Sequence, residues 1–208
     1  MIWFHDIDPS GLSSCFSGYV RCRRSALWKE PITLAIHWFI ESNMCAGGVE
    51  GALVLTQAAL EMVSWHLLVE ERKSCSVGGF RGLPAEDKIR FLLTHCGIPL
   101  LIPVGMSDLI AEGRKFNWDD GPAAITQIRN ALAHGQPKQL ETELQRDHSI
   151  RYDAWCLGLW YLELSLLKLF GFEGKYFSRV KRESYSFQNI DTVPWSSSTI
   201  AGAAGQVS

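Results

Sequence analysis

The sequence has six cysteines but lacks the short paired spacings that zinc sites use. They stand at positions 15, 22, 45, 75, 96 and 156, and no two of them form a C-x-x-C pair. A structural zinc site needs such pairs to hold two ligands together in one turn. The sequence therefore predicts no metal site and no cofactor. Free thiols of this kind are typical of the reducing cytoplasm, where we expect the protein to reside.

The longest apolar stretch lacks the length of an uninterrupted membrane span. It runs from Ala154 to Phe170 and is interrupted by Glu163 and Lys168. A spanning helix needs about 20 residues of mostly apolar character. We therefore expect a buried or interface helix here and no membrane partner. Residues 1–8 also lack the basic start and the apolar run of a secretory signal.

The chain has no excess of positive charge that would draw it onto nucleic acid. Its formal net charge is −2 at pH 7, so attraction to nucleic acid or to an anionic membrane would have to be local. Two small basic clusters lie near the ends of the region expected to fold, and we interpret both as solvated surface. Their members are Arg21, Arg23, Arg24, Arg179, Lys181 and Arg182.

No stretch has the alternation of apolar and polar residues that is typical of a half-buried strand, and no repeat is visible. Helical periodicity instead dominates residues 26–195. These features predict an all-α fold, an up-and-down helical bundle of one domain. Residues 1–25 mix glycine, serine and cysteine, and they are predicted to be irregular, with one short helix as the alternative. Residues 196–208 are predicted to be a disordered tail.

Two of the predicted helices are apolar on much of their surface. In the first, residues 31–43, we expect Leu34, Trp38 and Ile40 to face inward. The second, residues 49–70, is apolar on nearly every side and should lie in the middle of the bundle.

The helix over residues 49–70 carries one polar line. Gln57, Glu61 and Ser64 follow an i, i+4, i+7 spacing and fall on one face. A buried carboxylate needs a partner. We therefore expect Glu61 to form an ion pair with Arg129, which would make Glu61 a supporting residue and not a catalytic one.

Another predicted helix is marked clearly at both ends. Asp119 or Asp120 can cap its start, Pro122 lies in its first turn, and Gly135 stands where a helix ends in the left-handed conformation. Its predicted buried stripe consists of Ile125, Ile128 and Leu132.

The candidate active-site residues lie at the end of that helix, in the segment IRNALAHG over residues 128–135. Arg129 and His134 are five positions apart, which corresponds to about 140° of rotation on an ideal helix. Their side chains therefore do not point the same way within one helix. Asn130 and His134 are four positions apart and share a face.

The R-N-x-x-x-H pattern resembles the HEPN superfamily, in particular the RNA-cleaving domains of RNA-targeting CRISPR effectors and many toxin and abortive-infection proteins. Residues 30–195 also look like uncharacterised bacterial HEPN-containing proteins and the C-terminal HEPN domain of ApeA-type defence proteins. The resemblance implies a HEPN-like bundle over residues 26–195 and a homodimer that brings two Arg/His pairs into one cleft. It further implies an RNA substrate, a role as a stress, toxin or phage-defence effector, and an antitoxin or defence partner protein.

The chemistry expected of these residues is RNA cleavage without a metal. RNA carries its own nucleophile, the 2′-OH, so the enzyme must move protons and stabilise charge on the phosphorus. His134 can transfer protons near neutral pH, and Arg129 offers a planar, permanently charged group to phosphate oxygens. Asn130 completes the candidate catalytic set.

A non-catalytic interpretation stays open beside this one. In this interpretation Arg129 has a purely structural role as the ion-pair partner of Glu61, and His134 serves only as the cap of its helix. The chain would then be a HEPN-like helical module that binds RNA, a nucleotide or a protein partner. Three further histidines lie in apolar helices and are expected to be satisfied core or interface groups. They are His37, His66 and His95.

Overall fold

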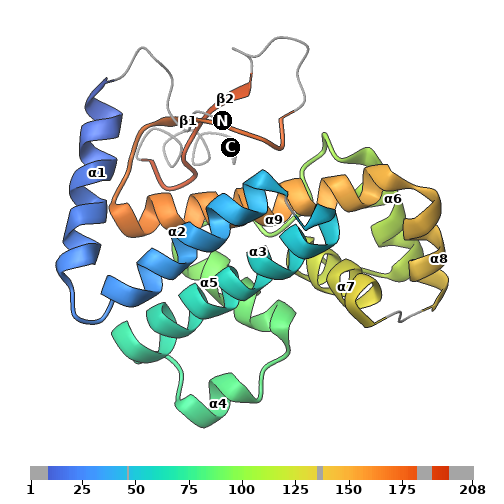
Figure 1. Cartoon of the computed structure of the whole chain (residues 1–208), viewed down its shortest axis with the longest axis horizontal. Helices are drawn as coiled ribbons and strands as arrows, with labels where there is room; N and C mark the ends of the chain where they lie inside the picture. Colours follow the sequence, from blue (N-terminus) through green and yellow to red (C-terminus); the bar gives the residue numbers. More distant parts are fainter. Residues whose placement is uncertain (1–8, 46, 135–137, 182–188, 197–208) are drawn as a thin grey trace, which may run out of the picture.

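The computed structural model describes residues 9–45, 47–134, 138–181 and 189–196 (Figure 1). Over these residues the chain is mostly helical, which confirms the predicted all-α bundle. The helices are α1 (Pro9–Arg24), α2 (Lys29–Met44), α3 (Gly48–Trp65), the π-helix η1 (His66–Glu71), α4 (Val77–Arg81), α5 (Ala85–Cys96), α6 (Ser107–Phe116), α7 (Gly121–His134), α8 (Lys138–Arg146) and α9 (His148–Phe170). Two strands follow, β1 (Lys175–Phe177) and β2 (Ile190–Thr192).

Helix α9 is the central helix of the bundle. It packs against α1, α2, α3, α5, α6, α7 and α8. Its sequence is apolar around most of its circumference, so a position surrounded by other helices buries all of its faces. This confirms that the long apolar stretch forms a buried helix.

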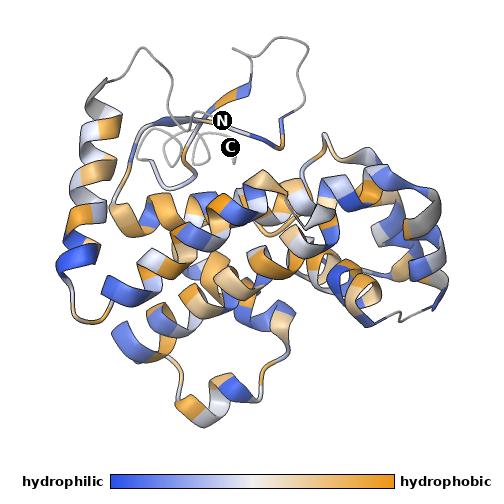
Figure 2. Cartoon of the chain, viewed as in Figure 1, coloured by the Kyte–Doolittle hydropathy of each residue, from blue (hydrophilic) through white to orange (hydrophobic). Residues whose placement is uncertain are grey.

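The second central helix is α3, which continues directly into η1. By length and composition, Gly48–Glu71 is the one helix of the described residues that could cross a membrane. It contacts α2, α5, α7 and α9, and 61% of its most apolar window is buried inside the protein. Figure 2 shows hydrophobic residues along this helix. Because other helices surround it, these residues belong to the core of the bundle.

The inward face of α2 differs from the predicted one. Leu34 and Ile40 are 38% and 48% exposed, so the prediction that they face inward is wrong. The buried face instead carries Ile32, Ala35 and Phe39. Because α2 has apolar residues on several sides, its sequence periodicity does not select one face. The contact with α3 makes that selection.

Helix α1 corrects the expectation of an irregular N-terminal segment and fits the alternative of one short helix. It packs along the C-terminal half of α9, with Cys15 and Cys22 in the core. The backbones approach so closely that a Cβ at Gly18 would overlap the backbone of Phe170. Glycine and serine are poor helix formers, so this contact with α9 explains why the helix forms here.

The segment after α9 folds back and pairs as a hairpin, which the sequence did not predict. Strands β1 and β2 are antiparallel, with Lys175 opposite Thr192. Each strand has three residues, which is too short for a period of two to be recognised.

A buried ion pair fixes this C-terminal segment to α9. Arg179 donates from Nε and Nη2 to the two carboxylate oxygens of Glu163, at 2.7 and 2.9 Å. Arg179 also donates to Asn43 Oδ1 at 3.2 Å, and its guanidinium lies over the Phe39 ring. The interpretation of Arg179 as solvated surface is therefore wrong, because the carboxylate inside α9 requires a cation. Arg182 lies outside the described residues.

Candidate functional site

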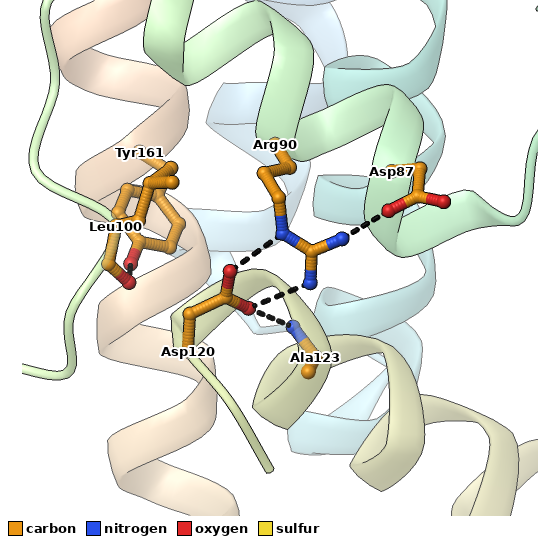
Figure 3. A network of polar contacts seen from close by, with 6 residues as sticks. All are labelled: Asp87, Arg90, Leu100, Asp120, Ala123 and Tyr161. Atoms are coloured by element: carbon orange, nitrogen blue, oxygen red, sulfur yellow. Dashed lines mark hydrogen bonds and ion pairs between the residues drawn. The ribbon is translucent and has the colours of Figure 1, made fainter.

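Asp120 caps the start of α7. It is one of the two residues that the sequence offered as the cap. Its Oδ1 accepts a hydrogen bond from the backbone N–H of Ala123 at 2.9 Å. The same carboxylate accepts from Nε and Nη2 of Arg90 in α5, at 2.6 and 3.1 Å, and Arg90 also pairs with Asp87 (Figure 3). Asp120 is buried, and two interactions hold its carboxylate: the ion pair with Arg90 and the hydrogen bond from the first turn of α7.

A second set of contacts joins the first residue of α7 to α9. Tyr161 donates its hydroxyl hydrogen bond to the backbone oxygen of Leu100 at 3.0 Å, and the Gly121 N–H donates to the same oxygen at 2.8 Å. A Cβ at Gly121 would overlap the Tyr161 hydroxyl, so this position requires glycine. The N-terminal end of α7 is thus held against both α5 and α9.

The buried face of α7 matches the predicted stripe in part. Ile125 and Ile128 are buried, together with Ala124 and Ala131, whereas Leu132 is only half-buried. This face packs against α3, α5, α8 and α9. The opposite side and the C-terminal end of α7 are left to carry polar groups.

Arg129 and Asn130 lie side by side on α7, and both are half-buried. Arg129 donates from Nη1 to Asn130 Oδ1 at 2.9 Å. Its Nε is buried and has no hydrogen-bond partner among the described residues. An unused buried donor is uncommon in folded proteins and calls for a reason. The guanidinium therefore keeps hydrogen-bonding capacity that the rest of the described chain does not use.

His134 is the last residue of α7 and is exposed. Among the described residues, no hydrogen bond or ion pair joins it to Arg129 or Asn130. The structure thus joins Arg129 to Asn130, and the spacing of five between Arg129 and His134 accounts for the lack of a bond between those two. Gly135, the predicted helix stop, lies outside the described residues.

Glu61 does not pair with Arg129, so that prediction is wrong. Its carboxylate lies 3.3 Å from the Lys88 ammonium and accepts a hydrogen bond from Gln57 Nε2 at 2.9 Å. Ser64 donates to the backbone oxygen of Lys88 at 2.7 Å. The polar line of α3 therefore faces α5, where Glu61 and Ser64 both interact with Lys88. The sequence showed the line and could not show which neighbouring helix it would meet.

The other histidines are less satisfied than expected. His66 Nδ1 is buried without a hydrogen-bond partner among the described residues, and burial lowers the pKa of His66 while Glu70 opposes this. His37 is exposed on α2, and His95 is exposed at the end of α5. His37 and His95 are therefore not core groups, and the alternative that they are interface groups stays a prediction.

The described residues contain no group of three or more histidine, cysteine or acidic side chains that could hold a metal ion. None of the six cysteines forms a disulfide, and burial raises the pKa of the Cys96 thiol to about 12. A thiol with a raised pKa is a poor nucleophile. Arg129, Asn130 and His134 thus remain the candidate chemical groups of α7.

Comparison with known proteins places most of the chain in one family. Residues 25–190 match the family described as the YopA C-terminal domain. The chain is also 32% identical over 181 residues to the SPbeta prophage-derived uncharacterized protein YopA of Bacillus subtilis (strain 168). That match covers 86% of this chain and 39% of the relative, so the chain spans about two-fifths of the relative's length.

No solved structure matches the chain. Neither of the matches carries the HEPN name. Helix α1 precedes the matched family segment, although it packs against α9 within it. The extent of the family match nevertheless covers α2 to β1, including the whole of α7. The chain therefore belongs to the YopA C-terminal domain family.

Proposed function

We propose that this domain is a metal-independent endoribonuclease of the HEPN type, with Arg129, Asn130 and His134 as its catalytic residues. The observation that supports it most is the state of Arg129. Its guanidinium is oriented by Asn130 and keeps a buried Nε without a partner among the described residues. A guanidinium oriented in this way offers its remaining N–H donors to a phosphate oxygen.

The proposed reaction uses the RNA itself as nucleophile. The 2′-oxygen attacks the adjacent phosphorus while one His134 accepts the 2′-OH proton. The bond from phosphorus to the 5′-oxygen breaks, and the leaving oxygen takes a proton from a second imidazole. Arg129 stabilises the negative charge on the phosphorane. The products are a 2′,3′-cyclic phosphate and a 5′-hydroxyl.

We propose that the second imidazole comes from a second copy of the chain. His134 is exposed at the end of α7 and forms no hydrogen bond with Arg129 among the described residues, so a two-fold pairing of α7 ends would complete the site. Such an interface would bury about 1,200 Å² or more in total. The apolar surface of α9 gives no further support to a dimer, because other helices of the chain cover it. Light scattering at micromolar concentration tests this, and a monomer would contradict it.

The decisive experiment is RNA cleavage by the purified chain in the presence of EDTA. We expect Arg129→Ala and His134→Ala each to lower the rate by roughly 10²- to 10⁴-fold, since each removes a group acting in the transition state. His37→Ala is the matched control, because His37 is also an exposed helical histidine and lies on α2. Cleavage that survives in both site variants, or that stops with EDTA in the unmodified chain, would contradict the proposal.

The cellular role follows from the same proposal. The relative is described as prophage-derived. We propose a toxin, stress or phage-defence effector that acts in the cytoplasm, with an antitoxin or defence protein as its partner. None of the six cysteines forms a disulfide, which is consistent with that compartment.

A non-catalytic module is the second candidate, favoured by the separation of His134 from Arg129. In that case the domain would bind RNA, a nucleotide or a protein through Arg129 without cleaving anything. RNA binding that is lost in Arg129→Ala but unchanged in His134→Ala, with no cleavage by the unmodified chain, would support this candidate over the nuclease.

A further inference from the structure

A recess with a basic lining lies at the end of α9. Its residues are distant in sequence from the candidate catalytic residues of α7. It has a volume of about 550 Å³, which is within the range of roughly 300–1,000 Å³ found for small-molecule sites. It is lined by residues of α1, the connection between α1 and α2, η1, the end of α5 and the last turns of α9. No residue of α7 lines it. We call this recess the basic pocket.

The charged groups of the basic pocket are mostly positive. Arg21, Arg72 and Lys168 carry permanent positive charges, and Glu71 supplies the single carboxylate of its lining. The chain as a whole has a net charge of −2, so this concentration of positive charge is a local feature. Positive charges gathered in a recess raise the local concentration of anions.

Two of the three cations are only weakly neutralised by the protein. Lys168 has no carboxylate partner among the described residues, and its ammonium lies 4.9 Å from the centre of the Trp195 ring. Arg72 pairs with Glu71 at 3.3 Å, but its side chain is 56% exposed. Exposed ion pairs of this kind contribute little to stability. Both cations can therefore take an anionic ligand at small cost.

The third cation is held firmly in the wall of the basic pocket. Arg21 donates from Nη2 to the backbone oxygens of Leu169 and Phe170, both at 3.3 Å. These carbonyls belong to the C-terminal end of α9, where the helix dipole favours a positive charge. A guanidinium has five N–H donors, so this anchoring leaves others for a ligand.

The groups at the end of α5 experience the positive charge directly. The pKa of His95 is lowered, first by burial and then by Arg72, with a further lowering by Lys168 and an opposing effect of Glu71. Neighbouring Cys96 also lies close to Lys168 and Arg72. The side chains of α5, η1 and α9 thus converge on one space and share one positive field.

The backbone around the basic pocket is unusual. The N–H of Arg72 donates to the oxygen of Leu67 at 2.9 Å, the five-residue spacing of a π-helix. Segments of this type are rare and occur frequently at functional sites. Trp28 Nε1 also donates to Glu71 Oε2 at 2.5 Å, which fixes the carboxylate at one wall. Buried Trp28 and Leu67 provide an apolar surface beside the charged groups.

We propose that the basic pocket binds a small organic phosphate. Lys168, Arg72 and Arg21 bind the phosphate group, and the apolar surface of Trp28 and Leu67 contacts the organic part. This site is separate from the proposed nuclease site, because no residue of α7 contributes to it. A free anion alone would use the cations but leave the apolar surface unused.

Isothermal titration calorimetry with the full chain tests the proposal, with ADP as the probe and adenosine and inorganic phosphate as comparisons at constant ionic strength. We expect ADP to bind more tightly than inorganic phosphate, and adenosine to bind at least tenfold more weakly than ADP. Lys168→Gln should weaken ADP binding by about tenfold or more, since it removes a charged hydrogen-bond donor. Glu71→Gln should strengthen it, because the amide keeps an acceptor for Trp28 and removes the only negative charge of the lining.

Lys73→Gln is the matched control, because Lys73 follows Arg72 directly but does not line the basic pocket. If Lys168→Gln proves unfolded by circular dichroism, Arg72→Gln replaces it, since the Arg72 side chain is largely exposed. Three results would overturn the proposal. They are no ADP binding at millimolar concentration, equal binding of ADP and adenosine, and equal weakening by Lys168→Gln and Lys73→Gln.

Discussion

Arg179→Met would test the buried ion pair that holds the C-terminal segment on α9. Glu163 and Arg179 have side chains that are only 3% and 4% exposed, and they share two hydrogen bonds of 2.7 and 2.9 Å. Methionine fills most of the arginine's volume and removes its charge. The carboxylate of Glu163 then stays buried without a cation.

We expect this substitution to lower the free energy of unfolding by about 3–5 kcal/mol, the usual loss when one partner of a buried pair is removed. With a urea dependence of roughly 2 kcal/mol per molar, the midpoint of unfolding should fall by about 1.5–2.5 M. Urea unfolding followed by circular dichroism measures it. The double variant Glu163→Leu with Arg179→Met should recover much of the loss, because no unpaired charge then remains.

The same pair predicts a dependence on pH that differs between two variants. Burial raises the pKa of Glu163, and the Arg179 guanidinium opposes this. In Arg179→Met the opposing charge is gone, so the folded state takes up a proton that the unfolded state does not hold. Stability is then greatest at low pH and is lost as the pH rises through the folded pKa, by up to about 1.4 kcal/mol per pH unit.

The loss in Arg179→Met should therefore be smaller at pH 5 than at pH 7.5. In Glu163→Gln the remaining group is an arginine, which does not lose its proton, so the loss should persist at both pH values. If both variants cost less than about 1 kcal/mol, or if Arg179→Met costs the same at pH 5 and at pH 7.5, the reasoning is refuted.

Three further predictions concern the start of α7 and the half-buried His66. Gly121→Ala should destabilise the chain by about 1–3 kcal/mol through overlap with the Tyr161 hydroxyl, and the melting temperature would report it. Asp120→Asn keeps an N-cap and loses the ion pair with Arg90, whereas Asp120→Ala loses both. Asp120→Ala should therefore lower the free energy of unfolding by about 1 kcal/mol more than Asp120→Asn. Equal losses in the two variants would argue against the cap. Burial lowers the pKa of His66 below 6.5, so its contribution to stability is present above pH 6.5 and is lost as the pH falls through the lower folded value. His66→Gln should reduce the loss of stability between pH 7.5 and pH 5.5, as measured by urea unfolding.

Local sequence signals mark the ends of α5 and the start of α7. Pro84 and Gly97 bracket α5, and Gly97 adopts the left-handed conformation at φ 69°, as a glycine after a helix commonly does. Asp120 caps α7, as its place before the helix indicated. These signals act between residues at most four positions apart, so they are the same in the isolated segment and in the folded chain.

For the candidate site, the local arrangement on α7 could also be predicted from the sequence. The order and spacing of Arg129, Asn130 and His134 follow from their places on one helix, and the contact between Arg129 and Asn130 is local. The partner of Glu61 was not predictable, because α3 is surrounded by several helices and its rotation decides which of them faces the polar line. That rotation places Lys88 of α5 beside Glu61.

The sequence by itself determined that the chain is mostly helical, where α7 begins, and that the apolar stretch over residues 154–170 forms a buried or interface helix. Only the tertiary structure decided which face of α2 is buried, that residues 9–24 form a helix, and that Arg179 meets Glu163. It also assembled the basic pocket from Arg21, Arg72 and Lys168, which lie far apart in the sequence. The physical reason is that caps and hydrogen bonds within a helix depend on neighbours in the chain, whereas pairings between helices depend on how the whole set of apolar faces packs.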